Sequence, residues 1–188
     1  THYKVTLRKD AFWHDGEPVV AEDVRYTLTQ LGAAAVRSPF AGLSRRIERV
    51  EIHHPHLLSI HLKAPHAPFI ADLAIGVVPH HLLHERGIFP DGEVVGSGPF
   101  KLTERQGDSW VALAAFDKHH HGRPPTDHVV FRVMPDDNTR LLALMGGSGQ
   151  LAQNAVSPLM LPVVQRDNSL IVETAPSFKY TYLGINLA

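Results

Sequence analysis

The stretch from Tyr3 to Val24 reads YKVTLRKDAFWHDGEPVVAEDV and predicts a strand, a tight turn and the start of a helix. Apolar and polar residues alternate over residues 3–8, which is typical of a strand. In His14-Asp15-Gly16, the Asp-Gly pair can supply the positive-φ position of a turn. A helix is predicted from Ala21 to Leu31, because Glu22 and Asp23 complement the dipole of its first turn.

The remainder of the chain alternates between predicted strands and helices, which indicates a mixed α/β (α+β) fold. A loop is expected from Ala33 to Leu43, because this segment contains Ser38-Pro39 and Gly42. Ile47–His53 and Leu57–Leu62 predict a hairpin or two neighbouring strands. Further strands are predicted at 100–104, 110–115, 128–133 and 180–187, and further helices at 69–74, 80–86, 138–145 and 157–166.

The composition is that of a globular protein: 188 residues, 44% hydrophobic and 20% charged, with a formal net charge of −1. This near-neutral charge argues against a nucleic-acid-binding surface. The lack of cysteine excludes disulfides, thiolate metal sites and cysteine nucleophiles. No segment reaches the roughly 18–20 apolar residues of a membrane span, and no signal peptide is recognisable. Because the chain opens within a predicted strand, we expect it to be a piece of a longer protein.

The strongest break in the pattern lies near residue 95. Asp91-Gly92 and Gly96-Ser97-Gly98-Pro99 combine the residues that favour turns. We therefore expect two parts, a smaller α+β subdomain at 1–94 and a core part at 95–188.

A series of motifs follows in order along the chain. After the opening stretch come Ile60–Pro65 with Pro68-Phe69, then Val95–Leu102, Gly122-Arg123-Pro124, Val130–Val133, Asp136 with Arg140-Leu141, and Tyr182–Asn186. This series resembles family 5 of the bacterial extracellular solute-binding proteins, the peptide- and nickel-type receptors of ABC importers. Three departures concern the ligand class: Gly147–Gln150 lacks the family's acidic residues, His119-His120 replaces Tyr-Trp, and Val20 replaces a capping Thr.

The resemblance implies a periplasmic binding protein type II-like fold, of which this chain would be a partial first lobe with its attached smaller subdomain. It implies capture of a short peptide or similar small solute by lobe closure, with the missing second lobe of the parent chain and the ABC permease membrane subunits as partners. It implies no enzyme activity, no cofactor, no nucleic-acid partner and a periplasmic or extracellular location, membrane-associated in the parent. The alternatives are a cytoplasmic ligand-sensing domain of a transcription regulator with the same fold, and a His-rich nickel or other metal receptor.

The resemblance also suggests ligand-binding residues. In the nickel-binding branch, an arginine and an aromatic residue three positions later meet the ligand, and Arg37 and Phe40 have that spacing here. The Arg37 guanidinium could pair with a carboxylate, and the Phe40 ring could form an apolar wall. Tyr180, Tyr182 and Asn186 fall where the chain should cross between lobes, so they are expected near the hinge.

Other motifs favour structural interpretations. Fourteen histidines raise a metal hypothesis, in which His80, His81 and His84 share a predicted helix and His119–His121 form a run. No metalloprotease motif accompanies them, and we predict no metal site. Ser97 lacks the Gly-x-Ser-x-Gly elbow of hydrolases. Gly146–Gly149 lacks the lysine of a phosphate-binding loop, so it is expected to end a helix.

Overall fold

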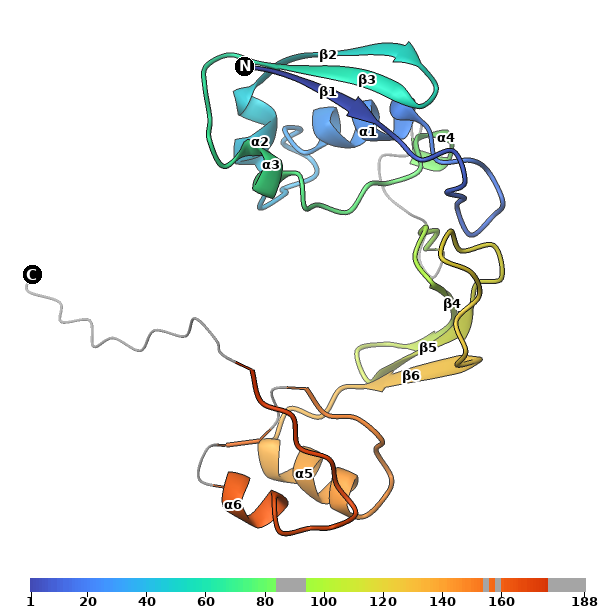
Figure 1. Ribbon diagram of the computed structural model, residues 1–188, viewed down its shortest axis with the longest axis vertical. Helices are drawn as coiled ribbons and strands as arrows, with labels where there is room; N and C mark the ends of the chain where they lie inside the picture. The colour runs from blue at the N-terminus through green and yellow to red at the C-terminus, as the bar shows by residue number, and fades with distance from the viewer. Residues whose placement is uncertain (84–93, 154–155, 158–159, 176–188) are drawn as a thin grey trace, which may run out of the picture. The chain divides into compact units, whose positions relative to one another are not determined.

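A computed structural model of the 188-residue chain describes residues 1–83, 94–153, 156–157 and 160–175 (Figure 1). Two compact units are present, residues 1–132 and 133–188. The predicted division at residue 95 falls inside the first unit, between the segments that form its two sheets. The division into a subdomain at 1–94 and a core part at 95–188 therefore stays a prediction.

The first sheet is formed by β1 (His2–Thr6), β2 (Ile47–His54) and β3 (Leu57–Leu62) in the order β1-β3-β2. Both pairings are antiparallel, so the predicted hairpin is confirmed. Alternation gives the sheet an apolar face, which helices cover in Figure 1. The core on that side is a cluster of buried residues from the sheet and helices, Ala21, Leu28, Leu43, Leu58, Ile60, Leu62 and Phe69.

Helix α1 spans Ala21–Gln30 and begins close to its predicted start. Val20, at the N-cap, has no side-chain oxygen to accept a hydrogen bond from the first turn. The reciprocal half of a capping box is present, because the Val20 N–H donates to the Asp23 carboxylate at 2.8 Å. Asp23 therefore fixes the start of this helix through a direct hydrogen bond in addition to its charge.

The loop predicted at 33–43 is too long by three residues. Helix α2 spans Ala41–Arg46 and includes Gly42, and burial of Leu43 outweighs the poor helix propensity of that glycine. Two more short helices follow, α3 (Phe69–Asp72) and α4 (His80–Leu83). Both fall within predicted helical segments, and residues 84–86 of the second lie outside the described part of the chain.

The second sheet consists of β4 (Phe100–Gln106), β5 (Trp110–Ala115) and β6 (His128–Arg132), antiparallel in chain order. All three were predicted. Every residue of the central strand β5 is half-buried, whereas β4 and β6 are mostly exposed. Turn-forming residues at 96–99, before β4, and at 122–125, between β5 and β6, explain why these strands are readable from the sequence.

The second unit contains α5 (Asp137–Met145) and α6 (Leu161–Val164). The first confirms the predicted helix at 138–145. The second is much shorter than the predicted 157–166, since Pro162 lacks an N–H and is tolerated only in a first turn. The predicted strand at 180–187 lies outside the described residues. No helix in the described part of the chain is long and apolar enough to cross a membrane.

Candidate functional site

The loop between α1 and α2 carries two exposed side chains, those of Arg37 and Phe40. Arg37 has φ 49°, a left-handed conformation that costs a non-glycine residue roughly 1 kcal/mol or more. Phe40 is 52% exposed although it is large and apolar. The structure thus places both predicted residues on one solvent-facing loop, three positions apart.

Arg37 differs in its contacts from Arg25 and Arg49, but it shares its lack of partners among the described residues with Arg45 and Arg46 of α2. Arg25 is held by Glu22, and Arg49 is held by Glu51 and Glu48. For the Arg37 side chain, no hydrogen bond or ion pair is found with the described residues. Its planar donor fork can therefore pair with a carboxylate, and the exposed Phe40 ring lies on the same loop.

The backbone keeps this loop in place at its two ends. Gly32 sits so close to α2 that a Cβ atom there would lie 2.7 Å from Ser44 Oγ. The Phe40 N–H donates to Ser38 Oγ at 3.1 Å, a local turn that leads into α2. The other predicted ligand residues, Tyr180, Tyr182 and Asn186, lie outside the described residues.

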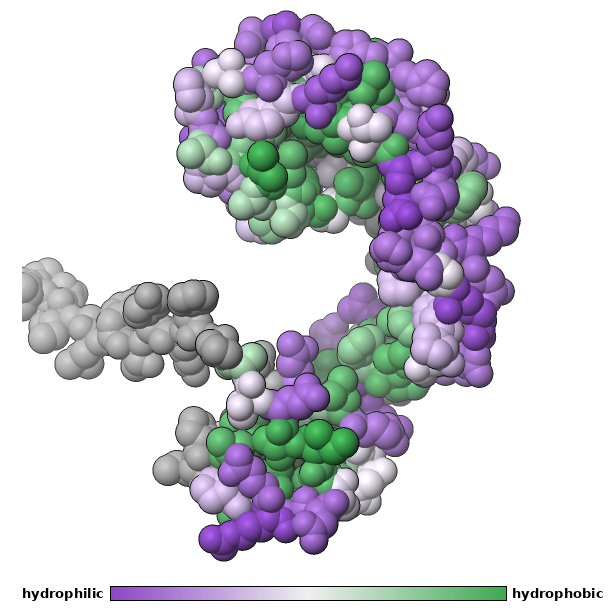
Figure 2. All heavy atoms as spheres, viewed as in Figure 1, coloured by the Kyte–Doolittle hydropathy of each residue, from purple (hydrophilic) through white to green (hydrophobic). Residues whose placement is uncertain are grey.

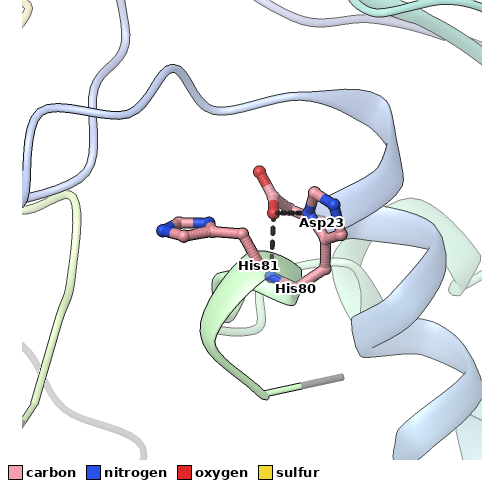
Figure 3. A group of neighbouring side chains, drawn as sticks. All are labelled: Asp23, His80 and His81. Carbon is pink, nitrogen blue, oxygen red and sulfur yellow. Dashed lines mark hydrogen bonds and ion pairs between the residues drawn. The ribbon is translucent and has the colours of Figure 1, made fainter. Parts of the chain in front are cut away.

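A second group of chemical interest joins α1 to α4 (Figure 3). Asp23, His80 and His81 have candidate ligand atoms within 4.8 Å of one another, and within the described ranges they are the sole such trio. The Asp23 side chain is completely buried. His84, the third histidine of the helix predicted at 80–86, lies outside the described residues.

The contacts of this trio fit a structural clamp better than a metal centre. Asp23 Oδ1 accepts from the His80 backbone N–H at 2.9 Å and from His80 Nδ1 at 2.6 Å. Asp23 Oδ2 accepts from Trp13 Nε1 at 3.1 Å and from the Val20 N–H at 2.8 Å. His81 Nε2 binds a different carboxylate, Asp15 Oδ2, at 2.8 Å. A metal ion would have to displace these partners, so the chemistry of the donors favours a structural clamp, and the absence of a metal site stays a prediction.

Two sequence motifs that are far apart in the chain meet at His14. Its backbone N–H donates to the Gly96 carbonyl at 2.8 Å, and its Nδ1 accepts from the Gly96 N–H at 3.2 Å. Nε2 then carries the ring proton and donates to the Gly98 carbonyl at 3.0 Å. A Cβ at Gly96 would lie 3.3 Å from His14 Cε1, which explains the glycine. Both motifs therefore serve the fold, as the sequence indicated for Ser97 and its neighbours.

Sequence reasoning identified the loop residues but missed Asp23. The acidic first turn of α1 suggested only a helix-dipole role for it. The available signal was Trp13, whose indole N–H needs an acceptor when it is buried, as it is here.

Comparison with known proteins decides the family. The model of the bacterial extracellular solute-binding proteins, family 5, matches residues 1–188. The chain belongs to this family. The family 5 chain is 25% identical over 193 residues to the oligopeptide-binding protein AppA of Bacillus subtilis, covering 98% of this chain and 35% of that protein. It is 26% identical over 212 residues to the dipeptide-binding protein of Escherichia coli, covering 98% of this chain and 39% of that protein.

Solved structures show the same fold. The family 5 chain matches AppA of B. subtilis, solved in complex with a nonapeptide, with a TM-score of 0.70 and 26% identity over 78% of this chain and 31% of that one. It also matches NikZ of Campylobacter jejuni, solved with Ni(L-His), with a TM-score of 0.82 and 24% identity. That match covers 89% of this chain and 34% of the other. The expected partial periplasmic-binding-protein fold is confirmed.

The chain spans about a third of the length of these relatives. The family is one of bacterial extracellular solute-binding proteins, so the prediction of a binding protein and not an enzyme is confirmed at that level.

Proposed function

We propose that this chain forms part of a receptor that captures a short peptide or similar small solute and delivers it to the membrane subunits of an ABC importer. The observation that carries the proposal is the loop with Arg37 and Phe40 on a family 5 fold. A guanidinium with no ion-pair partner among the described residues, on the same loop as an exposed ring, suits a small molecule with a carboxylate and an apolar side chain.

The peptide assignment draws on relatives. AppA is an oligopeptide-binding protein and was solved with a nonapeptide, and the E. coli relative is a dipeptide-binding protein. A peptide has a carboxylate at its C-terminus, which matches the donor fork of Arg37. Arg37 and Phe40 would contact the solute, with Tyr180, Tyr182 and Asn186 contributing near a hinge.

The proposed mechanism is closure of two lobes around the solute. This chain supplies contacts from one lobe, and a second lobe supplies the others, so the ligand shifts the equilibrium toward the closed state by its extra contacts there. Delivery to an importer places the protein on the outer side of the cytoplasmic membrane, in the periplasm or at the cell surface. With one lobe alone, we expect weak binding.

The test is a binding experiment on the intact protein with defined di- and tripeptides, preceded by native mass spectrometry to identify a co-purified solute. Substituting Arg37→Gln should raise the dissociation constant about 10- to 100-fold, because a charge-assisted hydrogen bond is lost. The matched control is Arg45→Gln, an exposed arginine of α2 that should leave affinity unchanged. Equal affinities for Arg37→Gln and the unmodified protein would refute the assigned contact. An intact protein that stays empty and binds no peptide would refute the transport role itself.

A further inference from the structure

The solvent side of the first sheet collects histidines from all three strands. His2 lies on β1, His53 on β2 and His61 on β3, with Glu51, Lys4 and Ser59 beside them around a surface depression of about 260 Å³. Figure 2 shows that hydrophilic residues cover this outer side of the sheet. The alternation of the strands explains the gathering, because Tyr3, Ile60 and Val50 point to the core instead.

His2 and His61 are direct cross-strand partners in the β1-β3 pairing. Their rings stack with centroids 4.4 Å apart and planes within 10° of parallel. Because the sheet already fixes both Cα positions, a metal ion that binds the pair restricts little further freedom of the chain.

His61 also has the support that metal-ligating histidines usually have. Its Nε2 lies 3.3 Å from Glu51 Oε2, and Arg49 Nε donates to Glu51 Oε1 at 2.6 Å. Arg49 and His61 thus contact different oxygens of the Glu51 carboxylate, which fixes its position beside the His61 ring. When Nε2 carries the proton toward Glu51, Nδ1 keeps its lone pair, which is the state that binds a metal.

We propose that His2 and His61 bind one divalent transition-metal ion of the class that prefers imidazole, such as Zn²⁺, Ni²⁺ or Cu²⁺, and that Glu51 orients His61. Water molecules would complete the coordination. Chelation needs two ring nitrogens about 3 Å apart, given metal–nitrogen distances of about 2.0–2.1 Å. The exposed His2 ring, which has no hydrogen bond to the described residues, can turn to meet that requirement.

This site differs from both earlier candidates. It shares no residue with the Asp23 clamp, whose carboxylate oxygens are saturated. It also shares none with the Arg37 loop, so it does not depend on the proposed transport function. The ion would be held on the outer face of the sheet, where it ties β1 to the central strand β3.

Calorimetric titration of the intact protein with Zn²⁺ and Ni²⁺, in the absence of histidine or other small chelators, tests the proposal. All variants are made in a background of His119→Gln, His120→Gln and His121→Gln, which removes the exposed run of three histidines.

His2→Gln or His61→Gln should abolish the site or raise its dissociation constant at least 10-fold. Glu51→Gln should weaken it about 10- to 100-fold, as expected for a supporting carboxylate. His53→Gln, in the same depression but outside the pair, is the matched control and should leave the affinity unchanged.

A second measurement separates metal binding from a loss of folding. Zn²⁺ should slow hydrogen exchange of the β1 and β3 amides in the background protein and not in the His2→Gln/His61→Gln double variant, whose own spectrum should report an intact sheet. Unchanged metal affinity in that folded double variant would overturn the proposal, as would equal losses in His53→Gln and His61→Gln.

Discussion

Asp23 shows how one buried carboxylate can organise several segments. Its two oxygens accept hydrogen bonds from Trp13, Val20 and His80, which belong to the opening turn, the start of α1 and the start of α4. Burial makes each of these bonds costly to lose, because the donors would be left without water or another acceptor.

Replacing Asp23 with asparagine should destabilise the protein by about 3 kcal/mol, since the new amide N–H group faces donors and an unsatisfied buried group costs about 1–3 kcal/mol. Urea unfolding measures the loss. The control is Asp72→Asn, which removes a similar carboxylate–histidine pair with His66 that is partly exposed. That change should cost about 1 kcal/mol or less. Equal losses of stability in the two variants would show that Asp23 does not hold the opening turn, α1 and α4 together.

At the scale of single elements, α1 and α5 begin in different ways. α1 starts after Val20 and depends on a carboxylate inside its first turn. α5 has a conventional N-cap, since Asp136 accepts from the Thr139 N–H at 2.8 Å and from Thr139 Oγ1 at 2.9 Å. The hydrogen bond from the Thr139 backbone N–H has the larger effect and that from Thr139 Oγ1 the smaller, and both hold the pKa of Asp136 below its ordinary value of 3.8.

The N-cap predicts a pH dependence for α5. A carboxylate with a depressed folded-state pKa contributes stability above its ordinary value of 3.8, and that contribution is lost as the pH falls through the lower folded-state value. The gap in melting temperature between the unmodified protein and Asp136→Ala should therefore be widest at neutral pH and should narrow as the pH falls below 3.8. Circular dichroism at several pH values measures it. Asn138→Ala, also in the first turn, should show no such closing gap, and a pH-independent gap for Asp136→Ala would contradict the assignment.

At the scale of the whole chain, His14 ties the opening strand–turn–helix segment to the turn that precedes the second sheet. Besides its hydrogen bonds to Gly96 and Gly98, its ring packs edge-on against Phe116 with centroids 5.0 Å apart. Phe116 directly follows β5 and is buried. The contacts of one side chain therefore connect the two sheet-forming segments of the first unit.

His14→Ala should lower the stability of the first unit by about 2 kcal/mol, because two side-chain hydrogen bonds of about 1 kcal/mol each are lost. Hydrogen exchange at the Gly96 amide, which donates to His14, should become faster. His128→Ala removes an exposed histidine from β6 and should change neither quantity. Protection of Gly96 that survives in folded His14→Ala would show that this connection does not depend on His14.

The sequence was sufficient for the secondary structure of most described segments and for the family. Strand alternation, turn residues such as Gly16 and Pro99, and the acidic first turn of α1 depend on neighbours within a few positions, so they are readable locally. The same local rules located Arg37 and Phe40 in a loop, but the spacing that marked them came from the resemblance. They failed at α2, where burial of Leu43 overrides an unfavourable Gly42.

Contacts between distant segments required the tertiary structure. Asp23 with His80, and His14 with Gly98, are 57 and 84 positions apart, and no local pattern specifies such partners. The pairing of His2 with His61 depends on the register of β1 against β3, since a shift by one residue would turn one ring toward the core. Local propensity thus sets where the elements of this chain lie, while long-range packing and register select which polar side chains meet.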